Sequence, residues 1–166
     1  MRDLAVFAAS FRESCADFEA ERDAILQVPR DPVALRADVV EMRRKMLAGH
    51  PNPTELFDLK HDAGGMVDIE FIVQFLVLAY SHQYPQLIGN LGNIALLRIA
   101  AEVGLIEANT AKAVGDAYRL LRARQHRLRL DGADKTRIQL SDEPDLIAAR
   151  DSVTLLWNEI FKTSSD

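Results

Sequence analysis

The sequence predicts an all-α protein, a bundle of about six helices with one long irregular loop at about residues 50–65. Apolar residues recur at spacings of three and four, capping side chains and prolines stand at segment boundaries, and no segment alternates as a strand does. The 166 residues, 48% hydrophobic and 27% charged, fit one globular domain over residues 1–166.

Two helices are expected before the loop. The first, within residues 1–30, places on one face Leu4, Phe7, Phe11, Cys15 and Phe18. Asp31 followed by Pro32 predicts the start of the second, because a capping side chain then precedes a proline at the first helical position. Its expected buried face contains Leu35, Val39, Met42 and Met46. The two prolines after Gly49 end this helix, since proline cannot donate a helical hydrogen bond.

Four further helices are expected after the loop. From Gly65 to Tyr80 apolar residues cover every side of the helical wheel, which is typical of a central helix. Asn90 or Asn93 is expected to cap the fourth helix and Asn109 the fifth. The segment from Ser141 to Pro144 opens the last helix. Residues 136–140 are too few to assign.

Composition excludes several classes of function. The formal charge is −5, which argues against binding of nucleic acid or an anionic membrane by the whole surface. The longest apolar run, residues 69–80, is shorter than the roughly 18–20 residues that cross a bilayer, and no signal peptide is recognised. A single cysteine, Cys15, cannot form an intramolecular disulfide, which fits a reducing compartment. We therefore expect a cytoplasmic protein without nucleic-acid or membrane partners.

The end of the long loop contains the candidate site. Lys60, Gly64, Gly65, Asp68 and Glu70 surround the start of the buried helix. Glycines permit close backbone approach, a helix N-terminus presents unpaired N–H groups, and lysine supplies positive charge, so the pattern indicates a phosphate site. In the alternative interpretation, Asp68 complements the helix dipole and the two glycines form a tight turn. Both interpretations stay open from the residues alone.

A metal site is not expected. Mg²⁺ between Asp68 and Glu70 would relieve their repulsion of a phosphate, but positions i and i+2 of a helix point roughly 200° apart. Two carboxylates so placed do not easily share a metal. His50, His61 and His82 lack metal-ligand spacing, and Cys15 is remote from them, so no zinc site is expected either.

The same segment resembles a known family. Lys60, followed by GGMVDIEFIVQ at residues 64–74, is similar to the K-x-x-x-G-G-x-x-D-I-E-F segment of the bifunctional glutamine synthetase adenylyltransferase and adenylyl-removing enzyme. A shorter form also resembles the uridylyltransferase of the PII signalling protein. The residues Met66-Val67-Asp68 resemble the second, adenylylating half of that enzyme. The resemblance covers about residues 31–162, including Asn90 to Leu97 and Trp157, and is weaker over residues 1–30.

The resemblance implies a role beside a separate catalytic domain. Each half of such an enzyme pairs a nucleotidyltransferase domain with a helical domain, and the former has a Gly-Ser turn and an acid-x-acid pair that hold the metals. No Gly-Ser occurs here, and Asp68-Ile69-Glu70 lies on a helix. The catalytic carboxylates are therefore expected upstream, and this chain alone is expected to be inactive. Magnesium and ATP belong to the full-length enzyme, and neither is expected to bind tightly to this chain alone.

The fifth helix is a candidate docking surface. Between residues 105 and 130, six basic residues stand against two acidic ones, a local balance of +4. Lys112 lies near its start, and the expected partner-binding residues are Arg119, Arg122, Arg124, Arg127 and Arg129. They could face an acidic partner, such as glutamine synthetase or PII, or an anionic effector. Alternatively, their aliphatic stems cover neighbouring helices on a solvated face. A DNA-binding helix-turn-helix is disfavoured by Glu107 and Thr110.

Two functions are predicted from these features. The first is the C-terminal helical domain of a glutamine synthetase adenylyltransferase in the regulation of nitrogen metabolism. In this role it covers or orients the active site of an upstream nucleotidyltransferase domain and receives regulatory contacts. The alternative is a free-standing helical interaction module that docks through its basic fifth helix. A Gly-Ser and acid-x-acid domain encoded upstream of Met1 would favour the first.

Overall fold

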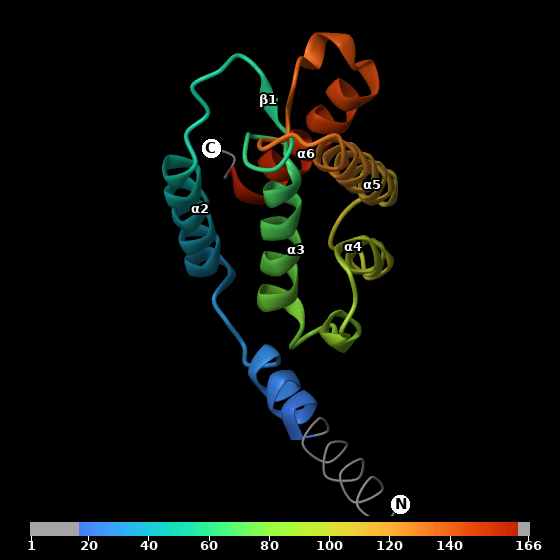
Figure 1. The fold of residues 1–166 in the computed structure, drawn as a ribbon. Helices are drawn as coiled ribbons and strands as arrows, with labels where there is room; N and C mark the ends of the chain where they lie inside the picture. Colours follow the sequence, from blue (N-terminus) through green and yellow to red (C-terminus); the bar gives the residue numbers. More distant parts are fainter. Residues whose placement is uncertain (1–16, 163–166) are drawn as a thin grey trace, which may run out of the picture.

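The computed structural model describes residues 17–162, and most of them are helical (Figure 1). A helical segment over residues 17–26 precedes α2 (Pro32–Gly49), α3 (Met66–Tyr80), α4 (Asn93–Glu102), α5 (Ala108–Leu130) and α6 (Pro144–Phe161). Two 3₁₀ turns, η1 (Pro85–Ile88) and η2 (Leu140–Asp142), join them. The predicted all-α class is confirmed. Cys15 and most of the first predicted helix lie outside the described residues, and the single domain over residues 1–166 stays a prediction.

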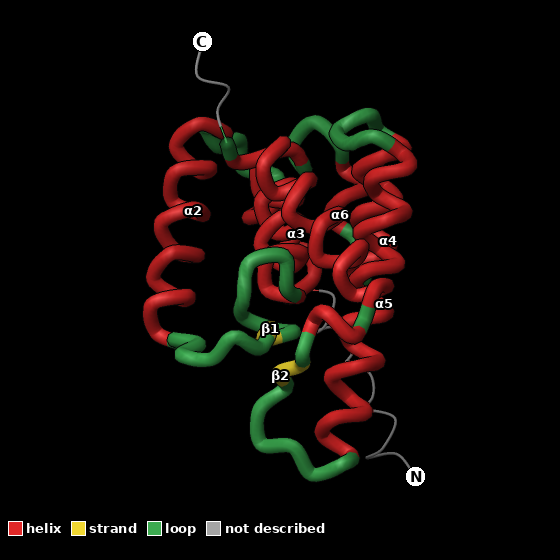
Figure 2. Tube along the Cα trace, turned by 90° about the horizontal axis from the view of Figure 1, so that it is seen from above, coloured by secondary structure: helices red, strands yellow, loops and turns green. Residues whose placement is uncertain are grey.

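Helix α3 is the centre of the bundle, as its apolar surface predicts. It contacts α2, α4, α5 and α6, and both views place it between α2 on one side and α4 and α5 on the other (Figures 1 and 2). Ile69, Ile72 and Phe75 are almost completely buried. Because neighbours surround α3 on several sides, its apolar residues need not keep to one face.

A short antiparallel ladder adds a feature that the periodicity does not predict. β1 (Phe57–Asp58) pairs with β2 (Arg137–Ile138), so that Phe57 lies opposite Ile138 and Asp58 opposite Arg137. Two residues are too few to show alternation, which explains why residues 136–140 could not be assigned. The ladder joins the long loop to the connection between α5 and α6 (Figure 2).

The helix starts are partly as expected. The Asp31 carboxylate caps α2 by accepting a hydrogen bond from Val33 N at 2.9 Å, and Pro32 is the first helical residue. The predicted caps of the next helices are wrong. Gly92, not Asn90 or Asn93, is the N-cap of α4, and Glu107, not Asn109, is the N-cap of α5. The Glu107 carboxylate reaches Thr110 N at 2.8 Å and so satisfies a free N–H group of the first turn.

Of the four residues expected on the buried face of α2, only Val39 is buried, and Leu35 and Met46 are half-buried. The side chain expected next after Val39 on that face, Met42, is 56% exposed. Arg43 takes its place and is only 6% exposed. The reason is electrostatic, because α2 packs against α3 where the carboxylate of Asp68 is buried and requires a cation.

Within residues 17–162, no helix combines the length and apolar character needed to cross a bilayer.

Two adjacent leucines of α6 provide a test of this packing. Leu156 is completely buried, whereas Leu155 is 63% exposed. We expect Leu156→Ala to lower the free energy of unfolding by about 2–5 kcal/mol. Leu155→Ala should change it by less than about 0.5 kcal/mol. Urea denaturation followed by circular dichroism measures both, and equal losses would contradict the position of α6.

Candidate functional site

A buried ion pair lies at the start of α3. The Arg43 guanidinium donates from Nε to the Asp68 carboxylate and from Nη2 to His61 O at 2.8 Å. Both side chains are at least nine-tenths buried. The second oxygen of Asp68 accepts Gly64 N at 2.7 Å. Burial raises the pKa of Asp68, because its effect outweighs those of the Arg43 guanidinium and the Gly64 N–H group. The pair thus joins α2, the loop and α3.

The two glycines allow the loop to pack closely. Gly64 has φ +82°, and a Cβ atom there would lie 2.5 Å from Arg150 Cγ and 2.7 Å from Arg150 O. At Gly65, a Cβ atom would lie about 3 Å from backbone oxygens of the loop, including that of Asp62 at 2.9 Å. A side chain at Gly64 would therefore collide with α6 as well as strain the backbone.

The N–H groups at the start of α3 are already bonded within the protein. Gly65 N donates to Asp62 O, Met66 N to Leu59 O and Val67 N to Lys60 O, at 2.9–3.1 Å. Together with the bond from Gly64 to Asp68, these contacts occupy the donors that a phosphate at a helix N-terminus would need. The geometry therefore favours the structural interpretation for Gly64, Gly65 and Asp68.

The side chains of the other two predicted site residues, Lys60 and Glu70, take no part in the hydrogen bonds of this turn. Glu70 lies on another side of α3 and accepts a hydrogen bond from Tyr118 on α5 at 3.3 Å. Lys60 lines a different cavity and is only partly buried. The structure does not bring the carboxylates of Asp68 and Glu70 together, and in the described part of the chain no group of His, Cys, Asp and Glu is arranged to hold a metal.

Lys60 belongs to a cavity of about 380 Å³, which we call the basic cleft. The cleft lies where the end of α2, the long loop, the end of α5 and β2 meet, and Figure 2 shows both loops converging on the ladder. Its basic side chains are Lys60, Arg129, Lys135 and Arg137. Its acidic side chains are Asp58 and Asp134. With neutral histidines the formal charge of the cleft is thus +2, in a chain of −5.

The buried carboxylate of Asp58 organises the floor of this cleft. It accepts hydrogen bonds from Lys60 N at 2.9 Å and His61 N at 3.1 Å, and lies 3.6 Å from Arg137 Nε. Burial raises the pKa of Asp58, but the two N–H groups and the nearby basic side chains outweigh it and hold the pKa below its ordinary value. Asp58 is therefore an anionic anchor of the loop.

Two histidines stack at the edge of the basic cleft. The rings of His50 and His61 are 4.3 Å apart and inclined by 8°. His50 Nδ1 lies 3.0 Å from Met46 O. Burial, with the nearby His50 and Lys60, lowers the pKa of His61 despite the opposing effect of Asp58. Sequence spacing did not indicate this pair, because the two rings come from segments eleven positions apart.

The arginines of α5 make several different contacts. Arg124 pairs with Glu143, and Arg129 lines the basic cleft. Arg119 pairs with Asp116, and the Arg122 guanidinium lies 5.7 Å from the Tyr118 ring centre. Arg119 and Arg124 thus form ion pairs within the described residues, whereas docking by these arginines and the alternative of a solvated face both stay predictions.

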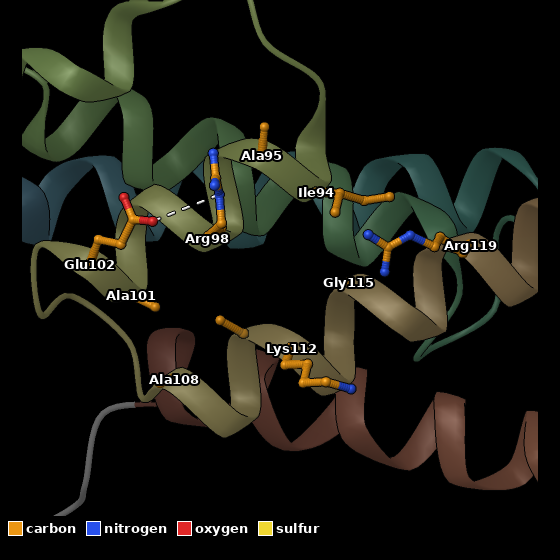
Figure 3. A pocket seen from close by; sticks show the side chains of 10 residues that line it. Ile94, Ala95, Arg98, Ala101, Glu102, Ala108, Lys112, Gly115 and Arg119 are labelled. Carbon is orange, nitrogen blue, oxygen red and sulfur yellow. Dashed lines mark ion pairs between the residues drawn. The ribbon is translucent and has the colours of Figure 1, made fainter.

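A separate groove of about 600 Å³ lies between α4 and α5 (Figure 3). Small residues contribute to its floor, and Ala101 and Ala108 face each other across it. Arg98, Lys112 and Arg119 stand at its rim with one acidic side chain, Glu102. The groove therefore combines an apolar floor with a mainly basic rim.

Comparison with known proteins identifies the family. The family model described as GlnD PII-uridylyltransferase matches residues 35–152. The chain is 52% identical, over 93% of its length, to the bifunctional glutamine synthetase adenylyltransferase/adenylyl-removing enzyme of Aromatoleum aromaticum. It is 53% identical, over 94% of its length, to the enzyme of that name from Bordetella bronchiseptica.

These matches define a helical domain of nucleotidyltransferase enzymes. The chain belongs to the GlnD PII-uridylyltransferase family, and its predicted resemblance to the glutamine synthetase adenylyltransferases is confirmed. It spans about 16% of the length of these relatives.

Adjacent arginines of α2 test the importance of the buried pair. Arg43→Ala leaves the Asp68 carboxylate buried without its cation and should lower the free energy of unfolding by about 3–5 kcal/mol. Arg44, whose ion pair with Glu41 is exposed, is the control, and Arg44→Ala should leave the free energy of unfolding nearly unchanged. Urea denaturation at neutral pH measures both. Equal small losses would show that the pair does not hold the loop.

Proposed function

We propose that this chain is the C-terminal helical domain of a nucleotidyltransferase that transfers AMP from ATP to glutamine synthetase. In this role it covers or orients the active site of a neighbouring nucleotidyltransferase domain and receives regulatory contacts. The observation that carries the proposal is the identity of about half of all residues, over nearly the whole chain, with glutamine synthetase adenylyltransferases. The position in the second half of such an enzyme is supported by residues 66–68.

Of the five site residues predicted from the sequence, Lys60 has the best position to face a neighbouring active site. Its side chain lines an open cleft and has no ion-pair partner within residues 17–162. Glu70 is partly exposed, whereas Gly64, Gly65 and Asp68 are buried and hold the loop in place. In the proposed site, Lys60 therefore contacts the nucleotide, and the buried residues position it.

Magnesium and ATP would be held mainly by the neighbouring domain. The carboxylate of Asp68 is occupied by Arg43 and Gly64, and that of Glu70 contacts Tyr118 on another helix. These two groups do not fit a shared Mg²⁺, so the metal ligands of the reaction belong to the acid-x-acid pair expected upstream. Bound Mg·ATP supplies the adenylyl group, and this chain contributes positive charge and a fixed surface.

The proposal predicts that adenylylation requires both parts. The intact mass of glutamine synthetase is measured after incubation with Mg·ATP and this chain, an upstream catalytic fragment, or both. We expect an increase of one AMP only with both parts, or a much faster increase with both. An increase with this chain alone would place catalytic carboxylates here and contradict the proposal. No increase with both, where the full-length enzyme is active and the two parts bind each other, would also contradict it.

In the full-length enzyme, Lys60→Ala should lower adenylylation by at least about tenfold, a loss of about 1.4 kcal/mol of transition-state stabilisation. Only the backbone of Lys60 is hydrogen-bonded to the turn, so its side chain can be removed without loss of a hydrogen bond or ion pair recorded within residues 17–162. Lys45→Ala, which removes an exposed lysine of α2, is the matched control. Unchanged turnover and ATP affinity in Lys60→Ala, at unchanged thermal stability, would refute the role of Lys60.

The groove between α4 and α5 favours the second function, docking of an acidic partner. Its apolar floor and basic rim suit a helix that carries carboxylates beside small or aliphatic residues. Glutamine synthetase and PII are the first partners to test for this function. In this function only the basic residues of α5 that border the groove, Lys112 and Arg119, contact the partner, instead of the whole basic face of α5.

Filling the groove tests this second function. Ala108 is exposed in the groove, so Ala108→Trp should block docking without loss of stability. Ala113→Trp, at an exposed position of α5 outside the groove, is the control. Sedimentation with purified glutamine synthetase or PII should show binding that weakens at least about tenfold in Ala108→Trp only. Equal binding by both variants would exclude the groove as the docking site.

A further inference from the structure

The basic cleft contains more cations than the neighbouring carboxylates neutralise. Lys60, Arg129 and Lys135 have no carboxylate within ion-pair distance among residues 17–162. Arg137 lies 3.6 Å from Asp58, and its buried Nε makes no hydrogen bond within the same residues. Four basic groups converge although the chain as a whole is acidic.

The acidic groups of the cleft leave this charge largely uncompensated. Asp58 is buried and its Oδ1 atom accepts two N–H groups of its own loop. Asp134 is exposed and has no basic partner within ion-pair distance in the described residues. The stacked rings of His50 and His61 complete the titratable groups that line the cleft. An anion placed among these groups would gain attraction from several cations at once.

Stabilisation of a helix C-terminus by cations explains only part of the positive charge of the cleft. Arg129 lies in the last turn of α5, where a cation stabilises the helix dipole. Arg127 already occupies that turn, and Lys60, Lys135 and Arg137 come from the long loop, the loop before β2 and β2 itself. Segments distant in sequence thus place basic side chains around one cavity, as in a site built for an anion.

We propose that the basic cleft binds an oligophosphate chain, the di- or triphosphate group of a nucleotide or its inorganic equivalent. The volume of about 380 Å³ falls within the range of small-ligand sites, roughly 300–1,000 Å³. The formal charge of +2 favours a ligand with several negative charges over a single carboxylate. Guanidinium and ammonium groups are the usual side-chain partners of phosphate oxygens.

Assignment of the ligand to the triphosphate of ATP rests on the proposed function, whereas oligophosphate binding itself does not. Lys60 would then act as one of several phosphate contacts instead of a lone charge. The surrounding loop is already fixed by Asp58 and by the pair of Arg43 and Asp68, so little reorganisation accompanies binding.

The test uses this chain and sodium tripolyphosphate without metal, followed by NMR of the four histidine Cε1–H groups. We expect saturable shifts of the His50 and His61 resonances, with His82 and His126 unchanged as internal controls. ATP should produce the same shifts, AMP weaker ones and adenosine none. An anion beside the rings should also raise the lowered pKa of His61.

Arg129 and Lys135 are exposed basic residues of the cleft and are suitable for substitution. The double variant Arg129→Gln/Lys135→Gln should weaken tripolyphosphate binding by at least about tenfold, because both side chains contribute charge but no fold contact to a carboxylate. Arg44→Gln/Lys45→Gln removes the same pair of residue types from an exposed part of α2 outside the cleft and should leave the affinity unchanged. Added NaCl should weaken binding to the unsubstituted chain.

Three outcomes would overturn the proposal: no shift of His50 and His61 at millimolar tripolyphosphate, equal affinity in both double variants, or oligoglutamate binding as tight as tripolyphosphate. The last would assign the cleft to an acidic peptide. Binding of tripolyphosphate without reconstituted adenylylation would retain the oligophosphate site and refute the proposed function. Adenylylation without tripolyphosphate binding would refute the oligophosphate site and retain the proposed function.

Discussion

The ion pair of Arg43 and Asp68 is the contact on which the arrangement of the loop depends. A carboxylate and a guanidinium removed from water destabilise a fold unless they bond to each other and to further polar groups. Here the Asp68 carboxylate accepts hydrogen bonds from Arg43 and Gly64, and Arg43 donates to Asp68 and to two backbone oxygens of the loop, while its buried Nη1 has no partner within residues 17–162. These bonds can be satisfied together only when α2, the loop and α3 are in register. The pair therefore fixes the direction in which the long loop reaches the central helix.

The rest of the loop follows from the same requirement to satisfy buried polar groups. The Asp62 carboxylate accepts Asp58 N and Asn52 Nδ2, and the Asp58 carboxylate accepts Lys60 N and His61 N. Acidic side chains are thus directed into the loop, where N–H groups need acceptors. Lys60 has no such role and lines the basic cleft. Because Asp58 and Asp62 are bonded within the loop, Lys60 has no carboxylate partner among the described residues and adds positive charge to the basic cleft.

The sequence predicted the helices well because their signals are local. The cap at Asp31, the apolar surface of α3 and the start of α6 at Pro144 depend on residues a few positions apart. Predictions failed where a contact with a residue distant in the sequence decides the local structure. Met42 fits the apolar face of α2, yet Arg43 occupies it because Asp68, 25 positions away, requires a cation. The two-residue ladder, the stacked histidines and the basic cleft likewise join distant segments, so no local spacing reveals them.

The stiffness of this loop constrains how the domain could serve a neighbouring active site. A mobile lid needs backbone groups that can exchange partners at little cost, whereas the turn before α3 has its N–H groups bonded within the protein and Gly64 packed against α6. The proposed contribution of the domain is therefore a preformed wall of positive charge and not a closing flap. Preorganised charge loses little free energy to reorganisation when phosphate charge develops beside it, which suits the proposed role beside a neighbouring nucleotidyltransferase domain.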